Sequence, residues 1–333
     1  MFQHPMIRRS FFYNTARAML VGLLCLSSGL LPSSAITITT TWDWGTTPVD
    51  DPNRVNVTSV WNSVVNYYGS TFQESYVDET WNISVSWKAL TGNQVANAGP
   101  SGDWKTGAEL MALATNSTQI RTGVNYSSTL ANHLAKSTVV TGTHIELNLN
   151  STVTWDFSTT SKAAGTESLY TTMIHEIGHG LGFLSLVDNG DGTYQGGTPS
   201  IFDYYLEKKD VTSTSLIDMD NDARKAATTS ANVFWTGQYG LDANGTPFKI
   251  YAPNTYEDGS SMSHLDFTVN TSESLIMFPS DSENPPNFSY SATELGMWKD
   301  LGYNVVPEPN TWMLVVVGGG MVLCIRGRRD AKA

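Results

Sequence analysis

The sequence predicts an α+β domain, because three segments show the pattern of strands and several others show helical spacing. Apolar and polar residues alternate in 36–44, 81–90 and 143–150, as they do in strands that bury one face. Apolar residues follow a helical stripe in 57–68 and again in 170–181. Regular patterns become sparse beyond these elements, so we expect the C-terminal part to be a loop-rich lobe.

The N-terminal end of the chain differs in composition from the rest. Residues 1–35 contain three arginines and no acid, then an apolar run over 18–31, and they end in small residues at Ala35. This is the pattern of a cleavable secretory signal peptide. We therefore expect an exported protein whose folded domain comprises residues 36–304. With 15% charged and 40% hydrophobic residues, the chain suits one sizeable domain or two lobes that share a cleft.

The charge and cysteine content of residues 36–304 narrow the choice of partners. Once the seven basic and two acidic residues of the two ends are set aside, 12 basic and 29 acidic side chains remain, a net charge of −17. Such a field repels phosphate backbones and anionic lipid surfaces, so we expect no nucleic-acid partner. The only cysteines are Cys25 and Cys324. The domain is therefore expected to fold without a disulfide.

The first half of the domain is expected to alternate strands and helices. The expected elements are a strand at 36–44, a helix at 57–68, a strand at 81–90, a short helix at 130–135 and a strand at 143–150. Residues 97–100 contain Gly and Pro and are expected to form a loop. Residues 108–114 fit either a strand or a short helix.

The second half is expected to contain more loop. Glycines gather in 190–197, a helix is expected at 201–206, and a closing helix at 292–300 ends before Gly302. The acidic segment DNGDGT at 188–193 is typical of a turn.

Three alternating acids at 218, 220 and 222 resemble the start of a calcium-binding loop. However, Ala223 stands where the glycine of such a loop belongs, and Thr229 stands where its bidentate glutamate belongs. An acidic, solvated turn is the better interpretation. A Ca²⁺ ion is compatible with this segment, but no motif supports it.

The most specific pattern in the chain is HEIGHGLGF, residues 175–183. His175 and His179 are four residues apart, so on a helix both side chains project from one face and can hold one metal ion. Glu176 lies about 100° further round the same helix. From there its carboxylate can reach a water on the metal without binding the metal itself, which is the position of a general base.

The expected limits of this helix can be read from its flanks. Thr166 is a candidate N-cap and Glu167 a first-turn acid, while Gly182 is placed to end the helix. The alternative interpretation is a core helix with two structural histidines. His133 and His144 precede the motif and are expected to have structural roles.

A catalytic zinc ion has three protein ligands and one open position for water, so a third ligand is required. The residue at the common position, six after His179, is Ser185, which is a poor zinc ligand. His264 is the only histidine downstream of the motif. Asp266 and Glu207 are the alternatives, although the glycine after the motif argues against Glu207.

Several motifs together resemble the leishmanolysin-like and bacterial reprolysin-like branches of the metzincin zinc metallopeptidases. They are HExxHxxGF at 175–183, a long insertion, GSSMSH at 259–264 and a methionine, Met277, in an LIMFP segment. The resemblance covers residues 143–303. It implies a zincin-like fold, with a twisted mixed sheet and helices above the active-site helix and a loop-rich lobe below. It also implies that His264 is the third zinc ligand and that Met277 packs beneath the metal.

The expected activity is peptide hydrolysis by a secreted zinc endopeptidase acting on protein or peptide substrates. Zn²⁺ bound to His175, His179 and His264 lowers the pKa of its water to about 7. Glu176 takes the proton and hands it to the leaving amine. Tyr290 is a candidate for an additional donor to the oxyanion.

The C-terminal segment, residues 305–333, resembles the PEP-CTERM sorting signals of Gram-negative bacteria. It contains Pro-Glu-Pro at 307–309, an apolar run at 312–325 and then three arginines. The resemblance implies a transient membrane association, a sorting peptidase that removes the tail, and a final location outside the cell or on its surface. A plain C-terminal anchor is the alternative, although 14 apolar residues are short for a bilayer span.

Two other functions are compatible with the sequence. One is a non-catalytic extracellular matrix or surface protein whose fold is stabilised by zinc. Glu176 argues against it, because a purely structural zinc site needs no general base. The other is a metal-dependent hydrolase of non-peptide bonds, which the HExxH helix with its glycine makes less favoured than a peptidase.

Overall fold

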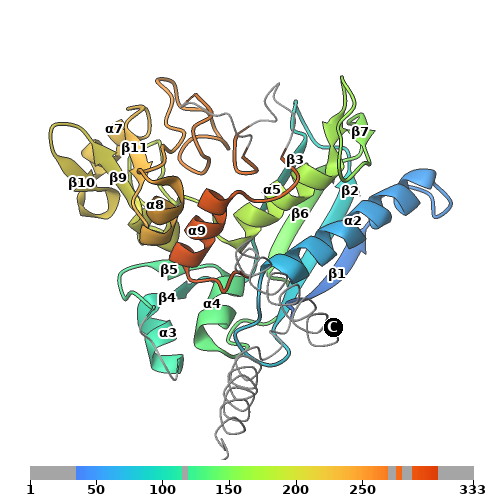
Figure 1. Ribbon diagram of the computed structural model, residues 1–333, viewed down its shortest axis with the longest axis horizontal. Helices are drawn as coiled ribbons and strands as arrows, with labels where there is room; N and C mark the ends of the chain where they lie inside the picture. The colour runs from blue at the N-terminus through green and yellow to red at the C-terminus, as the bar shows by residue number, and fades with distance from the viewer. Residues whose placement is uncertain (1–34, 115–118, 269–274, 280–286, 307–333) are drawn as a thin grey trace, which may run out of the picture. The chain divides into compact units, whose positions relative to one another are not determined.

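A four-stranded mixed sheet supports the motif-bearing helix in the computed structural model of this protein. The structure describes residues 35–114, 119–268, 275–279 and 287–306, which all belong to one compact unit. The sheet has the order β1-β2-β6-β3 (Figure 1). Its strands are β1 (Thr37–Asp43), β2 (Thr80–Lys88), β6 (Ile145–Asn150) and β3 (Ala96–Pro100). The first three are parallel, and β3 is antiparallel to β6 at one edge.

The three strands expected from alternation are confirmed, but the expectation of a loop at 97–100 was wrong. These residues belong to β3, which pairs Ala98 with Leu147 and Pro100 with Ile145. An edge strand tolerates proline, because its outer edge pairs with no further strand and a residue facing outward there needs no N–H donor. The pairing is made by residues about 50 positions away in the sequence, so local composition did not reveal it.

Helix α2 (Pro52–Thr71) connects β1 to β2 and packs on the sheet. It is longer than predicted because Asp51 caps it, with its carboxylate accepting from Asn53 N (2.8 Å), and Pro52 stands at the first helical position. Its buried residues are Val57, Val60, Trp61, Val64 and Tyr68. These residues include most of the predicted stripe.

Helix α5 (Leu169–Leu181) carries the motif and lies against β3, β6 and α2. Figure 1 shows α2 and α5 side by side along the sheet. The helix begins later than predicted, because its N-cap is Ser168, whose hydroxyl accepts from Thr171 N. Thr166 instead donates to Ala163 O. Gly182 ends the helix as predicted, with a left-handed φ of 109°.

Shorter elements surround these helices. They are β4 (Lys105–Thr106), α3 (Gly107–Leu113), β5 (Asn125–Tyr126), α4 (Ser128–Ala135), β7 (Trp155–Asp156) and β8 (Glu167–Ser168). The alternatives for residues 108–114 are resolved in favour of a helix, which starts with a capping box between Thr106 and Glu109. Glu167 lies in β8 rather than in the first turn of α5.

The part after Gly182 has more regular structure than expected. It contains a three-stranded antiparallel sheet of order β10-β9-β11, which the sequence analysis missed. Its elements are η1 (Gln195–Gly197), α6 (Ile201–Tyr204), β9 (Leu206–Lys209), β10 (Ser213–Ser215), η2 (Leu216–Asp218), α7 (Asn221–Ala227), β11 (Val233–Trp235) and α8 (Gln238–Asn244). The helix predicted at 201–206 ends at Tyr204, and Leu206 already belongs to β9.

The acidic segments of this part serve turns and caps. Asp220 is the N-cap of α7 and accepts from Ala223 N (2.8 Å). Asp188 and Asp191 accept backbone N–H groups within their own turn. Among the described residues, none of these acids belongs to a group that could hold a metal ion.

Helix α9 (Ala292–Leu301) closes the domain and packs against α8. It begins with a capping box between Ser291 and Glu294 and ends at Gly302, as the sequence predicted. The mixed sheet and the surrounding helices agree with the expected α+β class. The proposed signal peptide and sorting tail lie almost wholly outside the described residues. In the described ranges, every helix is too short or too polar to cross a bilayer.

Candidate metal centre

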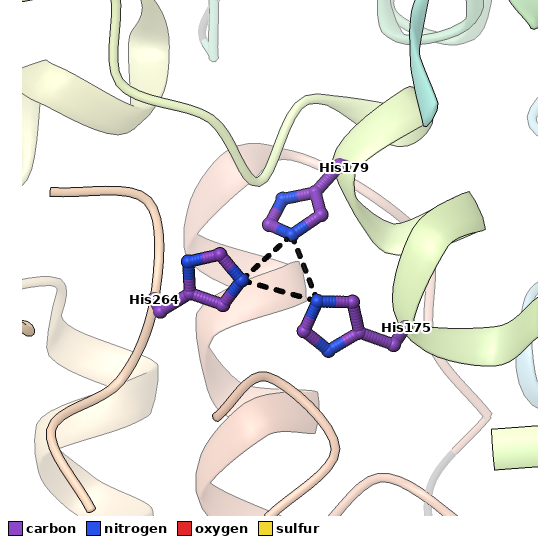
Figure 2. Close-up of side chains that lie close together, drawn as sticks. All are labelled: His175, His179 and His264. Atoms are coloured by element: carbon purple, nitrogen blue, oxygen red, sulfur yellow. Dashed lines mark hydrogen bonds between the residues drawn. The ribbon is translucent and has the colours of Figure 1, made fainter. Parts of the chain in front are cut away.

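Three histidine side chains from distant parts of the chain converge on one point (Figure 2). His175 and His179 come from α5, and His264 comes from the long insertion that follows the helix. The Nε2 atoms of His175 and His179 are 3.0 Å apart, and each lies 3.1 Å from Nε2 of His264. Among the described residues this is the one group of three or more side chains suited to a metal ion.

The other ring nitrogen of each histidine determines what these three Nε2 atoms can do. Nδ1 lies 2.7 Å from Ile276 O in His175, 2.8 Å from Phe183 O in His179 and 2.7 Å from Ser260 O in His264. A carbonyl oxygen only accepts, so each Nδ1 carries a proton and donates it. In a neutral imidazole Nε2 then presents a lone pair. Three lone pairs directed at one point repel one another and suit a cation.

Burial favours the neutral form of two of these imidazoles. Burial, together with the neighbouring His175, lowers the pKa of His179 to about 3. Burial likewise holds the pKa of His264 well below its usual value, with His179 and His175 contributing. The neutral form is the one that binds a metal ion.

Glu176 lies beside the three histidines and is 9% exposed. Burial raises the pKa of its carboxyl group to about 8, while a hydrogen bond from the Ala98 backbone acts in the opposite direction. A divalent cation nearby would favour the carboxylate and lower this pKa again. The proton affinity of Glu176 would therefore respond to a metal ion held by the histidines.

The alternative third ligands are engaged elsewhere. Asp266 pairs with Lys249 Nζ (2.9 Å) and accepts from Thr268 N (2.8 Å). Glu207 lies in β9 and is not part of the converging group. The structure therefore brings His264, rather than either acid, to His175 and His179.

Ser185 stands at the common position of a third zinc ligand, but here it forms structural hydrogen bonds. Its hydroxyl donates to Asp203 Oδ1 (2.6 Å), and its N–H donates to Ser263 Oγ (3.1 Å), next to His264. Asp203 is fully buried and also accepts from Leu186 N and Ser200 N. Ser185 thus joins the start of the insertion to its end.

Met277 packs against α5, the helix that carries two of the histidines, while its place beneath a metal ion stays a prediction. It is fully buried, and its sulfur lies against α5 at Gly178, between His175 and His179 in the sequence. The sequence analysis did not single out Gly178 or Gly180. HEIGHGLGF has a glycine at every second position from 178 to 182. Glycines inside a helix can indicate close packing against a neighbour, so this pattern could have pointed to Gly178 and Gly180.

Tyr290 does not occupy the position of an oxyanion donor in this structure. Its hydroxyl lies in the core, 3.2 Å from Ile174 O and 2.9 Å from Tyr68 Oη. The other two histidines also have partners in the core. His133 Nδ1 contacts Glu79 (2.8 Å), and Nδ1 of His144 accepts from Asn82 N (3.2 Å).

A pocket of about 240 Å³ opens beside the centre. Its walls combine apolar side chains with two threonines and two acids. The lining residues are Val95, Glu167, Thr171, Thr172, His175, Glu176, Leu275, Ile276, Phe278, Pro279 and Asn287. The pocket can therefore hold a side chain next to a bond that lies at the metal centre.

No protein-family model matches the chain, and the curated proteins gave no significant match. The chemistry of the site is therefore inferred from its own residues.

Proposed function

We propose that this protein is a zinc-dependent endopeptidase. The observation that supports it most is the convergence of three Nε2 lone pairs beside Glu176, at the mouth of a pocket. Three imidazoles with an open fourth position are a catalytic zinc set. With Zn–N bonds of about 2.0–2.1 Å, tetrahedral geometry separates ligand nitrogens by about 3.3 Å. The observed distances of 3.0 and 3.1 Å are close to this value.

The chain's own residues supply the rest of the chemistry. Zinc, when bound, lowers the pKa of a water to about 7 and polarises the carbonyl of the substrate. Glu176 accepts the proton of that water and returns it to the leaving amine. The carbonyls of Ile276, Phe183 and Ser260 fix the orientation and tautomer of the three histidines.

An edge strand beside the site supports a peptide as substrate. β3 lies at the edge of the sheet and contacts α5, and its Ala98 backbone reaches Glu176. An extended peptide can add to such an edge through main-chain hydrogen bonds. Val95, just before β3, lines the pocket, so a side chain of the same peptide can enter it. This arrangement favours peptide bonds over other hydrolysable bonds.

The finer expectations are part of the same proposal. The fold is proposed to be zincin-like and the family metzincin, on the basis of the motif residues, the Met277 contact and the antiparallel edge strand. The protein is proposed to be exported from a Gram-negative bacterium through residues 1–35. Residues 305–333 are proposed to hold it at a membrane until a sorting peptidase removes them.

The test uses the full chain and two measurements, zinc content and chelator-sensitive hydrolysis of casein. Glu176→Gln is expected to keep its zinc and lose hydrolysis by a factor of about 10² or more. Casein hydrolysis that survives in this variant would contradict the mechanism. Zinc binding without hydrolysis in the wild type would favour a non-catalytic matrix or surface protein instead.

A further inference from the structure

A single peptide group connects a metal-centre histidine to a buried carboxylate. The C=O of Ile276 accepts from His175 Nδ1 at 2.7 Å. The N–H of the same peptide belongs to Met277, and it donates to Glu294 Oε1 at 2.8 Å. A peptide is planar and conjugated, so its two ends form one rigid unit.

Glu294 is built to hold this peptide. It is fully buried, and as the third residue of α9 it accepts from Ser291 N at 2.7 Å. Its carboxylate also takes a hydrogen bond from the Ile276 backbone. A capping box normally serves the helix alone. Here the same carboxylate extends beyond the helix to the segment that carries Met277.

The charge at one end of the peptide affects the histidine at the other. A carboxylate on the N–H polarises the C=O, which then accepts more strongly. A stronger acceptor on Nδ1–H orients the ring and makes Nε2 a better donor to a metal. The peptide that holds His264 differs, because Ser261 N donates to a neutral backbone carbonyl, Glu257 O (2.9 Å).

We propose that Glu294 is a positioning residue for His175, acting through the Ile276–Met277 peptide to strengthen metal binding. This inference rests on the metal centre of the proposed function. It does not require that the centre hydrolyse peptides.

The experiment measures zinc affinity of the full chain by competition with a chromophoric chelator, together with thermal unfolding with and without zinc. Burial raises the pKa of Glu294 to about 7, so the assays are made at pH 8, where the group is charged. Glu294→Gln is expected to weaken zinc binding about 10- to 100-fold. Ser291→Ala is the comparison variant: it removes the hydroxyl that accepts from Glu294 N and also bonds to the Glu294 carboxylate, but it leaves the carboxylate on Met277 N.

A merely structural role predicts a different result. It would lower the unfolding temperature without zinc in both variants and leave both zinc affinities equal to that of the wild type, which would overturn the inference. If Glu294→Gln does not fold, Glu294→Asp retains the charge but withdraws it from Met277 N. This variant is then expected to bind zinc more weakly than Ser291→Ala, and equal affinities would overturn the inference. A wild type that binds zinc but cleaves nothing rejects the proposed activity alone.

Discussion

Met277 Sδ lies 2.8 Å from the point that a Cβ atom on Gly178 would occupy, so the methionine packs against α5 here only because position 178 has no side chain. Two residues further, and so on nearly the opposite side of the helix, a Cβ on Gly180 would approach Ile145 Cγ2 to 2.3 Å. The two glycines let α5 lie closely between the Met277 segment and strand β6. This close packing holds the helix that carries His175 and His179 against both neighbours.

Gly180→Ala is expected to destabilise the protein by about 1–3 kcal/mol. Alanine normally stabilises a helix interior by about 1 kcal/mol relative to glycine. A decrease in the free energy of unfolding would therefore be caused by the clash with Ile145. Gly178→Ala should also destabilise the protein, because its Cβ would approach both Met277 Sδ (2.8 Å) and the buried Tyr290 hydroxyl (2.9 Å), but these approaches are less close than that of Gly180 to Ile145. Urea unfolding of both variants provides the measurement. A stabilised Gly180→Ala would show that the helix does not lie this close to β6.

His264→Ala is expected to lose bound zinc, because two histidines alone hold the ion weakly. Asp266→Asn is the matched comparison, since Asp266 is the nearest acidic alternative but pairs with Lys249. It should keep the zinc content of the wild type. Metal analysis after dialysis measures both, and circular dichroism checks that each variant is folded. The assignment of His264 is wrong if the two variants retain zinc equally.

Ser185→Ala is expected to lower the free energy of unfolding by about 1–3 kcal/mol, because it removes a hydrogen bond to a buried carboxylate. Burial raises the pKa of Asp203, and the Ser185 hydroxyl is the first of the groups that lower it. Ser161→Ala is the control, since Ser161 is exposed and its hydroxyl donates to an uncharged partner, Ser158 Oγ. The measurement is urea unfolding at pH 7. Equal stability of the two variants would argue that Asp203 does not depend on Ser185.

Peptides with an acidic side chain in the pocket are expected to be cleaved about 10-fold more slowly than their neutral counterparts. Two acids, Glu167 and Glu176, line the pocket, and its described lining contains no lysine or arginine. Lys162 lies 3.5 Å from Glu167 and reduces this effect. Glu167→Gln should therefore speed cleavage of the acidic peptide and leave the neutral peptide unchanged. Values of kcat/KM for matched peptide pairs decide the question.

Local patterns predicted the local parts of this structure. The strands near 36–44, 81–90 and 143–150 are confirmed because each carries its own alternation. The spacing of His175 and His179 placed them on one helix face for the same reason. A pattern of this kind spans only a few residues, so it reports nothing about distant partners.

Non-local pairing accounts for what was missed. β3 contains Gly99 and Pro100 and becomes a strand only through its pairing with β6. The small sheet around β9 consists of strands of three or four residues, which are too short to show alternation. His264 became a candidate because it is the only histidine downstream of the motif, and a family resemblance gave it its role; spacing alone could not bring residue 264 to residue 179. The role of Glu294 depends on a contact with Met277, 17 residues away.

His179 and His264 are 85 residues apart, so an ion bound to both would hold two distant segments of the chain together. The described part of the chain contains no cysteine, so no covalent link closes this loop. A bound ion acts as a removable cross-link across it. Unlike a disulfide, such an ion leaves when the chain unfolds, so it stabilises the closed loop by its own binding free energy. Chelation should therefore loosen the insertion, including its small sheet, and make it more susceptible to an added protease such as trypsin.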